Sequence, residues 1–212
     1  MGRPREHGDR TRDALRAAAE ELVAANGPDA LSVRAVATEV GTTTRAVYSL
    51  FGSKDGLVAA LAQKAFELLH DGLDGLPETA DAAADLIDVG AVVFRGFVRG
   101  HPALFRIAFQ RMIPGLHAGP ELTQARAGAF TRLEAKVRRL DDAGLLGDKS
   151  VLEAAVEFNA MCEGLGNAEL RGGTLRILPA GEEDRVWRDA LNTLVRGFGV
   201  GLAGVEPATS TL

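Results

Sequence analysis

The stretch Val33–Leu50, VRAVATEVGTTTRAVYSL, decides the fold. Its apolar residues fall at helical spacing on both sides of a glycine: they are Val36, Ala37, Val40, Val47 and Leu50. Gly41 stands between the two groups, where a left-handed backbone is cheap because glycine has no Cβ. The pattern predicts two short crossed helices that pack on a third, and it also fits an ordinary helix pair with a glycine turn.

The remainder of the chain also follows helical periodicity, and glycine, proline and capping residues separate the apolar segments. Aromatic residues make up only 5% of the 212 residues, and this composition favours helices over strands. We therefore predict an all-α protein with a three-helix N-terminal head and a larger helical body. We expect about nine helices, near 9–26, 33–40, 44–51, 54–75, 80–99, 102–112, 120–141, 151–170 and 182–202.

Charge is distributed unevenly along the chain. The net charge of −5 falls entirely after residue 60, because residues 1–60 carry eight basic and eight acidic side chains. Residues 1–16 contain five arginines against three acids, which gives a basic N-terminal arm. An acidic body with a neutral head and a basic arm is compatible with nucleic-acid binding by the head alone.

Several classes of protein are disfavoured. Cys162 is the sole cysteine, so no disulfide can form within the chain. The arginine-rich N-terminus does not resemble a signal peptide, and no apolar run is long enough to span a bilayer, so we expect a cytoplasmic protein.

Nothing in the sequence indicates catalysis. It contains no phosphate-binding loop, dinucleotide glycine motif, HExxH or CxxC, and its four histidines are scattered. Cys162 lies in the middle of an expected helix, where a small packing residue is a better interpretation than a nucleophile. We expect no enzyme activity, no bound metal and no cofactor.

From Thr11 to Leu61 the sequence resembles the TetR family of regulators. The segments AANGPDALSV and RAVATEVGTTTRAVYSLFGSKDGLV carry the resemblance, and residues 46–58 are the most specific part. The resemblance implies a homodimer that binds a double-stranded, palindromic DNA operator. It implies a DNA-binding domain with its basic arm over residues 1–55, a ligand-binding and dimerisation domain over 56–204, and a flexible tail over 205–212.

The same resemblance places DNA contacts on and around the second short helix, which would lie in the major groove. The residues implied are Ser32, Arg34, Thr42, Thr43, Thr44, Arg45, Tyr48 and Lys54. Arg45 has two possible partners, since it could contact guanine O6 and N7 or a phosphate. Tyr48 and Lys54 would contact phosphates. Other members of the family often carry valine, serine and a small residue where Thr42, Thr43 and Arg45 stand.

The body contains HPALFR at residues 101–106, and the segments EGL and AEL follow later at residues 163–165 and 168–170. These segments resemble the subgroup whose body carries a Trp-His-Gly motif. The candidate ligand-binding residues are Phe97, Phe105, Phe109, Phe130, Asn159 and Glu163. Each of these phenylalanines fits plain core packing as well as ligand contact, and Glu163 fits a dimer-interface hydrogen bond equally well.

The last two helices are expected to form the dimer. The first of them carries, beside larger residues, the small residues Ala155, Ala160, Gly164, Gly166 and Ala168. An apolar stripe runs along the final helix at helical spacing. The stripe consists of Trp187, Leu191, Leu194, Phe198 and Leu202, and it also fits a core that lies within one chain. The function implied is a repressor that a small-molecule effector releases from DNA. A transcriptional activator of the same fold, or a helical interaction protein with a degenerate head, are the alternatives.

Overall fold

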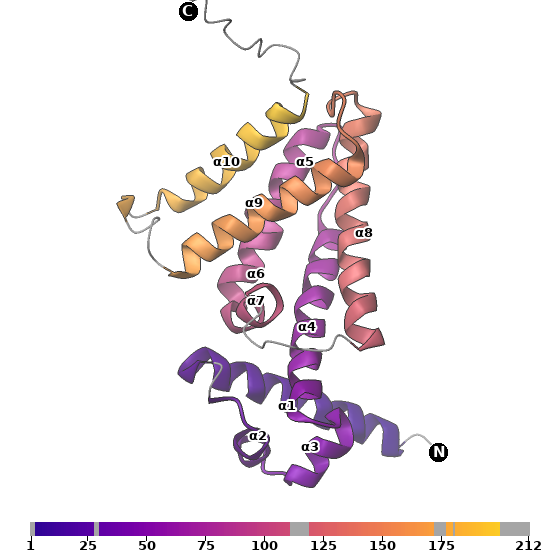
Figure 1. Ribbon diagram of the computed structural model, residues 1–212, viewed down its shortest axis with the longest axis vertical. Coiled ribbons are helices and arrows are strands. Elements are labelled where there is room, and N and C mark those ends of the chain that lie inside the picture. The colour runs from indigo at the N-terminus through magenta and orange to yellow at the C-terminus, as the bar shows by residue number, and fades with distance from the viewer. Residues whose placement is uncertain (1–2, 28–29, 111–118, 172–176, 180, 200–212) are drawn as a thin grey trace, which may run out of the picture. The chain divides into compact units, whose positions relative to one another are not determined.

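The computed structural model describes residues 3–27, 30–110, 119–171, 177–179 and 181–199. Within these ranges the chain contains helices and no strand, which confirms the all-α prediction (Figure 1). Ten α segments and one π segment are present. Since α5, η2 and α6 follow one another without a break, the described residues form nine continuous helices.

The N-terminal helices are α1 (Arg3–Asn26), α2 (Val33–Glu39), α3 (Thr44–Phe51) and α4 (Lys54–Gly75). The prediction for α1 was wrong at its start, because the helix begins six residues earlier than Asp9. Pro4 does not prevent this start, since the backbone N–H groups of a first helical turn have no partner in the helix.

The later helices are α5 (Ala82–Asp88), η2 (Val89–Phe94), α6 (Arg95–Gly100), α7 (Pro102–Phe109), α8 (Pro120–Asp142), α9 (Val151–Arg171) and α10 (Glu183–Phe198). The single helix expected over residues 80–99 is therefore interrupted by a π-helical segment, which residue periodicity alone does not reveal. The last helix ends at Phe198, earlier than expected. Leu202 and the tail predicted over 205–212 lie outside the described residues.

The chain divides into two compact units, which are described separately. The first unit comprises Met1–Gly72 and Phe97–Phe130, and the second comprises Leu73–Gly96 and Thr131–Leu212. In the first unit, α1 packs against α2, α3 and α7. In the second unit, α10 packs against α5, η2 and α9. The domain boundary expected at residue 55 stays a prediction.

Charged side chains on both sides of η2 pair with α10 in the second unit. Arg95 directly follows η2, is buried, and donates from Nε to both carboxylate oxygens of Glu169 at 3.0 and 3.2 Å. Its Nη1 donates to Asp184 at 2.9 Å, and the indole N–H of Trp187 donates to Glu169 at 2.7 Å. At the other end of η2, Asp88 accepts a hydrogen bond from Arg188 at 2.8 Å. Ion pairs with α10 therefore bracket the π segment on both sides.

The apolar stripe on α10 is not a free face. Trp187, Leu191 and Phe198 are almost completely buried within their own chain, and Leu194 is half-buried. The expectation that this stripe forms a dimer interface was therefore wrong for Trp187, Leu191 and Phe198, and the alternative of an intramolecular core is confirmed for these three residues. The reason is the close packing of α10 on α5 and η2, which removes these side chains from water.

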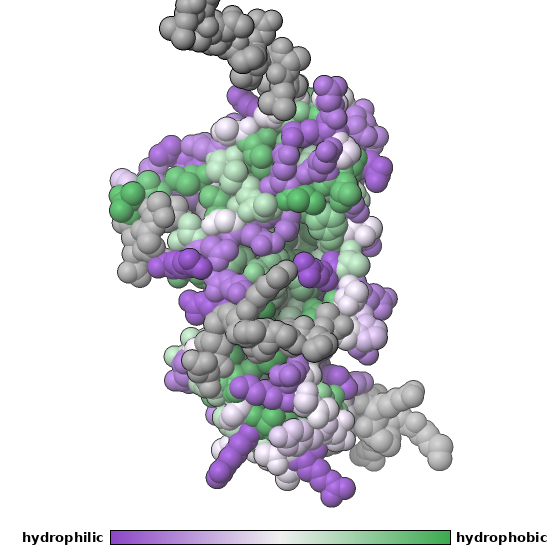
Figure 2. Space-filling view, in the orientation of Figure 1, coloured by the Kyte–Doolittle hydropathy of each residue, from purple (hydrophilic) through white to green (hydrophobic). Residues whose placement is uncertain are grey.

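A different row of apolar and small residues remains exposed on α9. Leu152 is 54% exposed and Val156 is 52% exposed, although both are large hydrophobic residues. Ala160 and Gly164 continue the row at intervals of four residues and are exposed as well. Residues four apart lie above one another on a helix, so these four form one ridge. Figure 2 shows hydrophobic side chains along α9 among hydrophilic neighbours.

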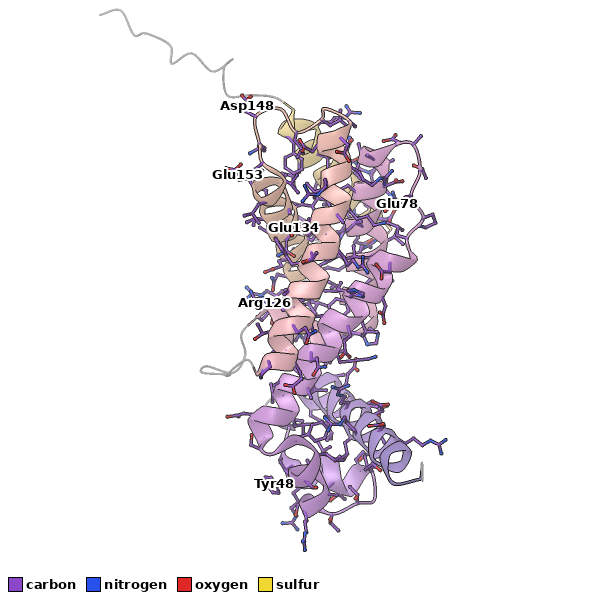
Figure 3. The ribbon with its side chains drawn as sticks, turned by 90° about the vertical axis from the view of Figure 1, so that its right-hand side faces the viewer. Tyr48, Glu78, Arg126, Glu134, Asp148 and Glu153 are labelled. Atoms are coloured by element: carbon purple, nitrogen blue, oxygen red, sulfur yellow. The ribbon has the colours of Figure 1, made fainter. Side chains whose placement is uncertain are left out.

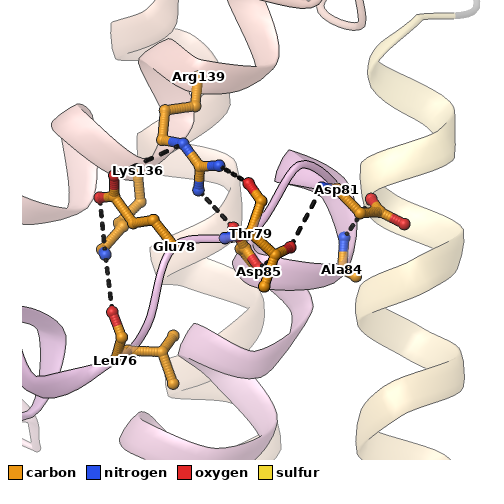
Figure 4. Close-up of polar contacts among 8 residues, drawn as sticks. All are labelled: Leu76, Glu78, Thr79, Asp81, Ala84, Asp85, Lys136 and Arg139. Atoms are coloured by element: carbon orange, nitrogen blue, oxygen red, sulfur yellow. Dashed lines mark hydrogen bonds and ion pairs between the residues drawn. The ribbon is translucent and has the colours of Figure 1, made fainter.

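A second polar cluster joins α8 to α5 and to the segment before it (Figure 4). The buried Asp85 carboxylate accepts hydrogen bonds from the backbone N–H and the hydroxyl of Thr79, both at 2.7 Å. Arg139 donates to the same carboxylate and to the Thr79 carbonyl oxygen. Beside them, Lys136 donates to Glu78 at 3.0 Å and to the Leu76 carbonyl oxygen at 3.3 Å. The buried charges of this cluster are all hydrogen-bonded.

Among the described residues, none of the helices combines the length and the apolar character that crossing a membrane requires.

Gly90 gives the first testable prediction. A Cβ at this position would lie 2.5 Å from Leu191 Cδ1 and 3.1 Å from Cys162 Sγ. Because both neighbours are buried, we expect Gly90→Ala to lower the free energy of unfolding by about 1–3 kcal/mol. Gly96→Ala is the matched control, since nothing lies within 4 Å of its Cβ, and it should stabilise the helix by about 0.5–1 kcal/mol. Urea denaturation measures both, and equal stabilities would contradict the proposed close contact.

Asp85 gives a second prediction, on pH dependence. Burial raises the pKa of Asp85. The hydrogen bonds from Arg139 and Thr79 lower the pKa by more than burial raises it, so the pKa lies below its ordinary value of 3.8. Because the pKa of Asp85 is lower in the folded protein than in the unfolded chain, the ionised carboxylate stabilises the folded state above pH 3.8. This stabilisation disappears as the pH falls through the pKa of the folded protein.

Asp85→Asn should therefore reduce the free energy of unfolding at neutral pH by about 1–3 kcal/mol, and should flatten its dependence on pH in the acidic range. Thermal unfolding monitored by circular dichroism between pH 3 and pH 7 measures both effects. Asp148→Asn, which changes an exposed acid in the same unit, is the control. A loss of stability that is the same at every pH would contradict the role assigned to the Asp85 carboxylate.

Candidate functional site

Two tight connections shape the helix pair α2–α3. The side chain of Ser32 caps α2 by accepting a hydrogen bond from Ala35 N at 3.1 Å. Gly41 adopts a φ of +69°, and the next backbone N–H, that of Thr42, donates to the Ala37 carbonyl oxygen at 2.8 Å. Ala37 is buried at this crossing. The positive φ explains why glycine is needed in the turn.

The second helix of the pair presents a polar face to solvent. Thr43 caps α3 by accepting from Ala46 N at 3.2 Å, and Val47 is the residue of α3 that is completely buried. On the opposite side, the exposed residues are Thr44, Arg45, Tyr48 and Ser49. Residues at spacings of three and four share one face of a helix, so these four form a continuous surface. Tyr48 is 52% exposed and points away from the helices in Figure 3.

The structure exposes most of the predicted DNA contacts. Seven of the eight candidates are exposed: Ser32, Arg34, Thr43, Thr44, Arg45, Tyr48 and Lys54. Thr42 is half-buried in the turn. Ser32 and Thr43 use a lone pair of their hydroxyl oxygens for capping, and this leaves each O–H able to donate elsewhere. Lys54 is the first residue of α4, whose N-terminus attracts anions.

Ser49 lies on the same exposed face as the candidate contacts, and the sequence analysis did not include it among them. It is exposed on the same face of α3, one turn after Arg45. Its interval of four residues from Arg45 is the signal that could have identified it.

The first helix supports α3 from behind. The guanidinium of Arg12 on α1 lies over the ring of Phe51, the last residue of α3, at 5.4 Å from the ring centroid. A cation–π contact of this kind stabilises the junction by about 0.5–1 kcal/mol at exposed sites. It connects the end of α3 to a helix that belongs to the same unit.

The predicted ligand-binding residues fall into two groups. Phe97, Phe105, Phe109 and Phe130 belong to the first unit, whereas Asn159 and Glu163 belong to the second. Phe109 lies at the centre of a ring cluster, with centroid distances of 5.4 Å to Phe66, 6.4 Å to Phe97 and 5.2 Å to Phe105. We call Phe66, Phe97, Phe105 and Phe109 the phenylalanine cluster. Phe109 is half-buried, whereas the other three are buried.

In the second unit, Asn159 and Glu163 lie one turn apart on α9 and contact each other. The Asn159 amide donates to Glu163 Oε1 at 2.6 Å, and both side chains are half-buried. The neighbouring Cys162 is buried, and its burial, with the nearby Glu163 carboxylate, raises the pKa of its thiol. A thiol that stays protonated behaves as a small packing group, in agreement with the interpretation of Cys162 from sequence.

In the part of the chain that the structure describes, no three His, Cys, Asp or Glu side chains gather where they could hold a metal ion.

Comparison with family models gives two matches. Residues 15–61 match the model described as bacterial regulatory proteins of the tetR family. Residues 87–194, half of the chain, match the model described as the C-terminal domain of tetracyclin repressor-like proteins. The first match covers the helix pair α2–α3. The subgroup with a Trp-His-Gly motif stays a prediction.

Individual relatives and solved structures are similar to the chain. The HTH-type transcriptional regulator Rv1816 of Mycobacterium tuberculosis is 33% identical over 110 residues, which cover 51% of this chain and 46% of the relative. The chain thus spans about half the length of the curated relatives it matches.

A protein of unknown function from Rhodococcus sp. RHA1 has a TM-score of 0.75 and 26% identity, covering 89% of this chain and 95% of that one. The TetR family transcriptional regulator PfmR from Thermus thermophilus has a TM-score of 0.64 and 20% identity, covering 86% and 97%. At this level of identity, the similarity to PfmR shows that the two chains share a fold.

Proposed function

Because this chain belongs to the TetR family of bacterial regulatory proteins, we propose that it is a transcriptional repressor that binds operator DNA through α3. The observation that carries the proposal is the exposed face of α3, where two threonine hydroxyls, Arg45 and Tyr48 lie on a capped helix. An eight-residue helix of this size fits the major groove of B-DNA.

The residues of α3 supply the groups that distinguish base pairs. The Arg45 guanidinium can donate two parallel hydrogen bonds to guanine O6 and N7, which contribute about 1–3 kcal/mol of discrimination. The Thr44 hydroxyl can donate or accept, and its methyl group can pack against a thymine methyl. Ser49 extends this surface by one turn and offers another hydroxyl. An Arg45 contact with a phosphate is the alternative, and it would add affinity without specificity.

Residues around α3 would fix the orientation of the helix on the duplex. Tyr48 is exposed, and its hydroxyl can donate to a phosphate oxygen. Lys54 combines its own charge with the N-terminus of α4, and Arg34 is exposed near the start of α2. Contacts of this kind are electrostatic, so binding should weaken steeply as salt increases.

Selection of bound duplexes from a random DNA pool tests this proposal. We expect enrichment of a palindromic site. Arg45→Ala should relax the preference at one base-pair position and cost about 1–3 kcal/mol there. Lys54→Ala should weaken binding to all sequences equally, and should reduce the salt slope of log K by about 1. Tyr48→Phe should weaken binding by about 1 kcal/mol, since it removes one hydrogen bond.

Arg138→Ala is the matched control for Arg45→Ala, because Arg138 is an exposed arginine on α8 in the other unit. It should leave both the selected sequence and its affinity unchanged. The proposal fails if the folded protein enriches no duplex, or if Arg45→Ala and Arg138→Ala have the same effect.

We further propose that two copies associate through the exposed ridge of α9. Half-exposed Leu152 and Val156 are costly to leave in water, and a second copy would bury them. Ala160 and Gly164 have small side chains, so the partner helix could approach closely along the same ridge. A two-fold axis would bring identical ridges together and would supply the two heads that a palindrome requires.

Val156→Arg tests the dimer. A two-fold interface would bury the new charge twice. We therefore expect the dissociation constant of the dimer to rise at least a hundredfold, which corresponds to a loss of about 3 kcal/mol of association free energy. Sedimentation equilibrium measures the change. Ala135→Arg places the same charge on an exposed alanine of α8, in the same unit, and should leave the dimer intact. A Val156→Arg protein that remains a dimer would show that the interface lies elsewhere.

The regulation we propose is release from DNA by a small molecule that contacts the phenylalanine cluster. Its aromatic rings favour a ligand with substantial apolar surface, and Phe109 is the member with the most exposure to solvent. By linkage, the effector would weaken DNA binding by the same factor as DNA weakens effector binding. No cofactor and no catalytic step form part of this proposal, and we place the protein in the cytoplasm, where its DNA lies.

A further inference from the structure

A short hydrogen bond connects α1 to the start of α7 within the first unit. His101 Nδ1 lies 2.7 Å from Glu20 Oε1, and a carboxylate accepts, so the imidazole N–H donates. The side chains of Glu20 and His101 are 24% and 38% exposed. His101 is the N-cap residue of α7, yet its side chain makes no capping hydrogen bond to that helix. It contacts α1 instead.

The other side of the imidazole contacts the phenylalanine cluster. The His101 ring stacks on Phe97 with a centroid distance of 6.0 Å and an interplanar angle of 26°. Phe97 in turn meets Phe109 edge to face at 6.4 Å. An unbroken series of contacts thus leads from Phe109 through Phe97 and His101 to Glu20. Because the imidazole packs against Phe97, a change in the position of these rings would also move the imidazole.

A second polar contact of α1 is much looser. Arg16, one turn before Glu20, lies 3.5 Å from Gln63 Oε1 and 4.0 Å from Glu67 on α4. Its buried Nε has no hydrogen-bond partner. Hydrogen bonds weaken with distance, so the contact of Glu20 with His101 holds α1 more firmly than the contacts of Arg16 do.

We propose that His101 is a positioning residue that couples the phenylalanine cluster to the DNA-binding helices through Glu20. Rings displaced by a ligand would move the imidazole and release the Glu20 carboxylate. Because α1 packs against both α2 and α3, the orientation of α3 would then be less restricted. This inference rests on the proposed function and assigns the route by which its effector site regulates DNA binding.

The test uses Phe109→Leu in place of the effector, whose identity is not known. This substitution removes one aromatic ring and so changes the packing of the phenylalanine cluster without any added ligand. We would measure the affinity for the selected duplex with and without Phe109→Leu, in four backgrounds: the unmodified protein, Glu20→Ala, Glu20→Gln and Glu21→Ala. Glu21 is the matched control, since it is an exposed glutamate next to Glu20 on α1 and its replacement removes the same charge. Glu20→Gln keeps an oxygen that can accept from His101.

We expect Phe109→Leu to weaken binding about fivefold or more in the unmodified, Glu21→Ala and Glu20→Gln proteins. In the Glu20→Ala protein the change should be no more than about twofold. A purely structural role of Phe109 would give the same loss in all four backgrounds, and that result would overturn the proposal. Circular dichroism verifies that every variant is folded.

Amide hydrogen exchange in the absence of DNA separates this inference from the proposed function. Phe109→Leu should accelerate exchange in the second half of α1 in the unmodified and Glu21→Ala proteins, and should add nothing in Glu20→Ala. This pattern without binding to any duplex would leave the coupling standing and reject the DNA-binding function. Equal acceleration in Glu20→Ala and Glu21→Ala would reject the coupling itself.

Discussion

The exposed face of α3 depends on one constraint, which is that an eight-residue helix is too short to be stable alone. The chain stabilises it from outside: Val47 is buried in the head, Thr43 caps its first turn, and Gly52 ends it with a positive φ. Because one fully buried side chain anchors the helix, the opposite face is left for polar groups. The recognition chemistry is therefore available only as long as the head is packed.

Among the described residues, the second unit differs from the head in that it contains buried charged side chains. Asp85, Arg95 and Lys136 are all buried, and each is hydrogen-bonded to partners from other segments. Breaking such a pair is strongly destabilising, whereas the complete pair adds little stability over apolar side chains. Their directional bonds connect α8 to α5 and to the segment before it, and connect the start of α6 to α9 and α10. The apolar core alone would hold these helices with less specificity.

Local patterns predicted the head well, because turns and caps depend on neighbouring residues. Ser32, Gly41 and Thr43 have the roles that their residue types indicate. The number of helices was predictable for the same reason. The stripe on α10 was assigned to the wrong partner, because periodicity gives a buried face without saying what covers it. That Trp187 packs within its own chain follows from contacts distant in sequence, such as its hydrogen bond to Glu169.

The candidate ligand-binding residues show the same limit. The sequence analysis grouped Phe109 and Glu163 as candidate ligand contacts, and this grouping stays a prediction; the two residues belong to different compact units. The link from Glu20 to His101 joins residues 81 positions apart, and neither periodicity nor a motif indicates it. Chemistry that is local in sequence is accessible to pattern analysis, but chemistry that depends on tertiary contacts is not.

The π segment η2 has a consequence for how this protein can change over evolution. A π turn arises when one residue is inserted into an α-helix, so that residues beyond it are rotated by about 100° relative to those before it. Asp88 and Arg95, at its two ends, are both paired with α10 in this rotated arrangement. A single-residue deletion between them would restore a regular helix and misalign one of the two pairs. The number of residues in this segment is therefore constrained by the two ion pairs, in addition to the packing that constrains Gly90 within it.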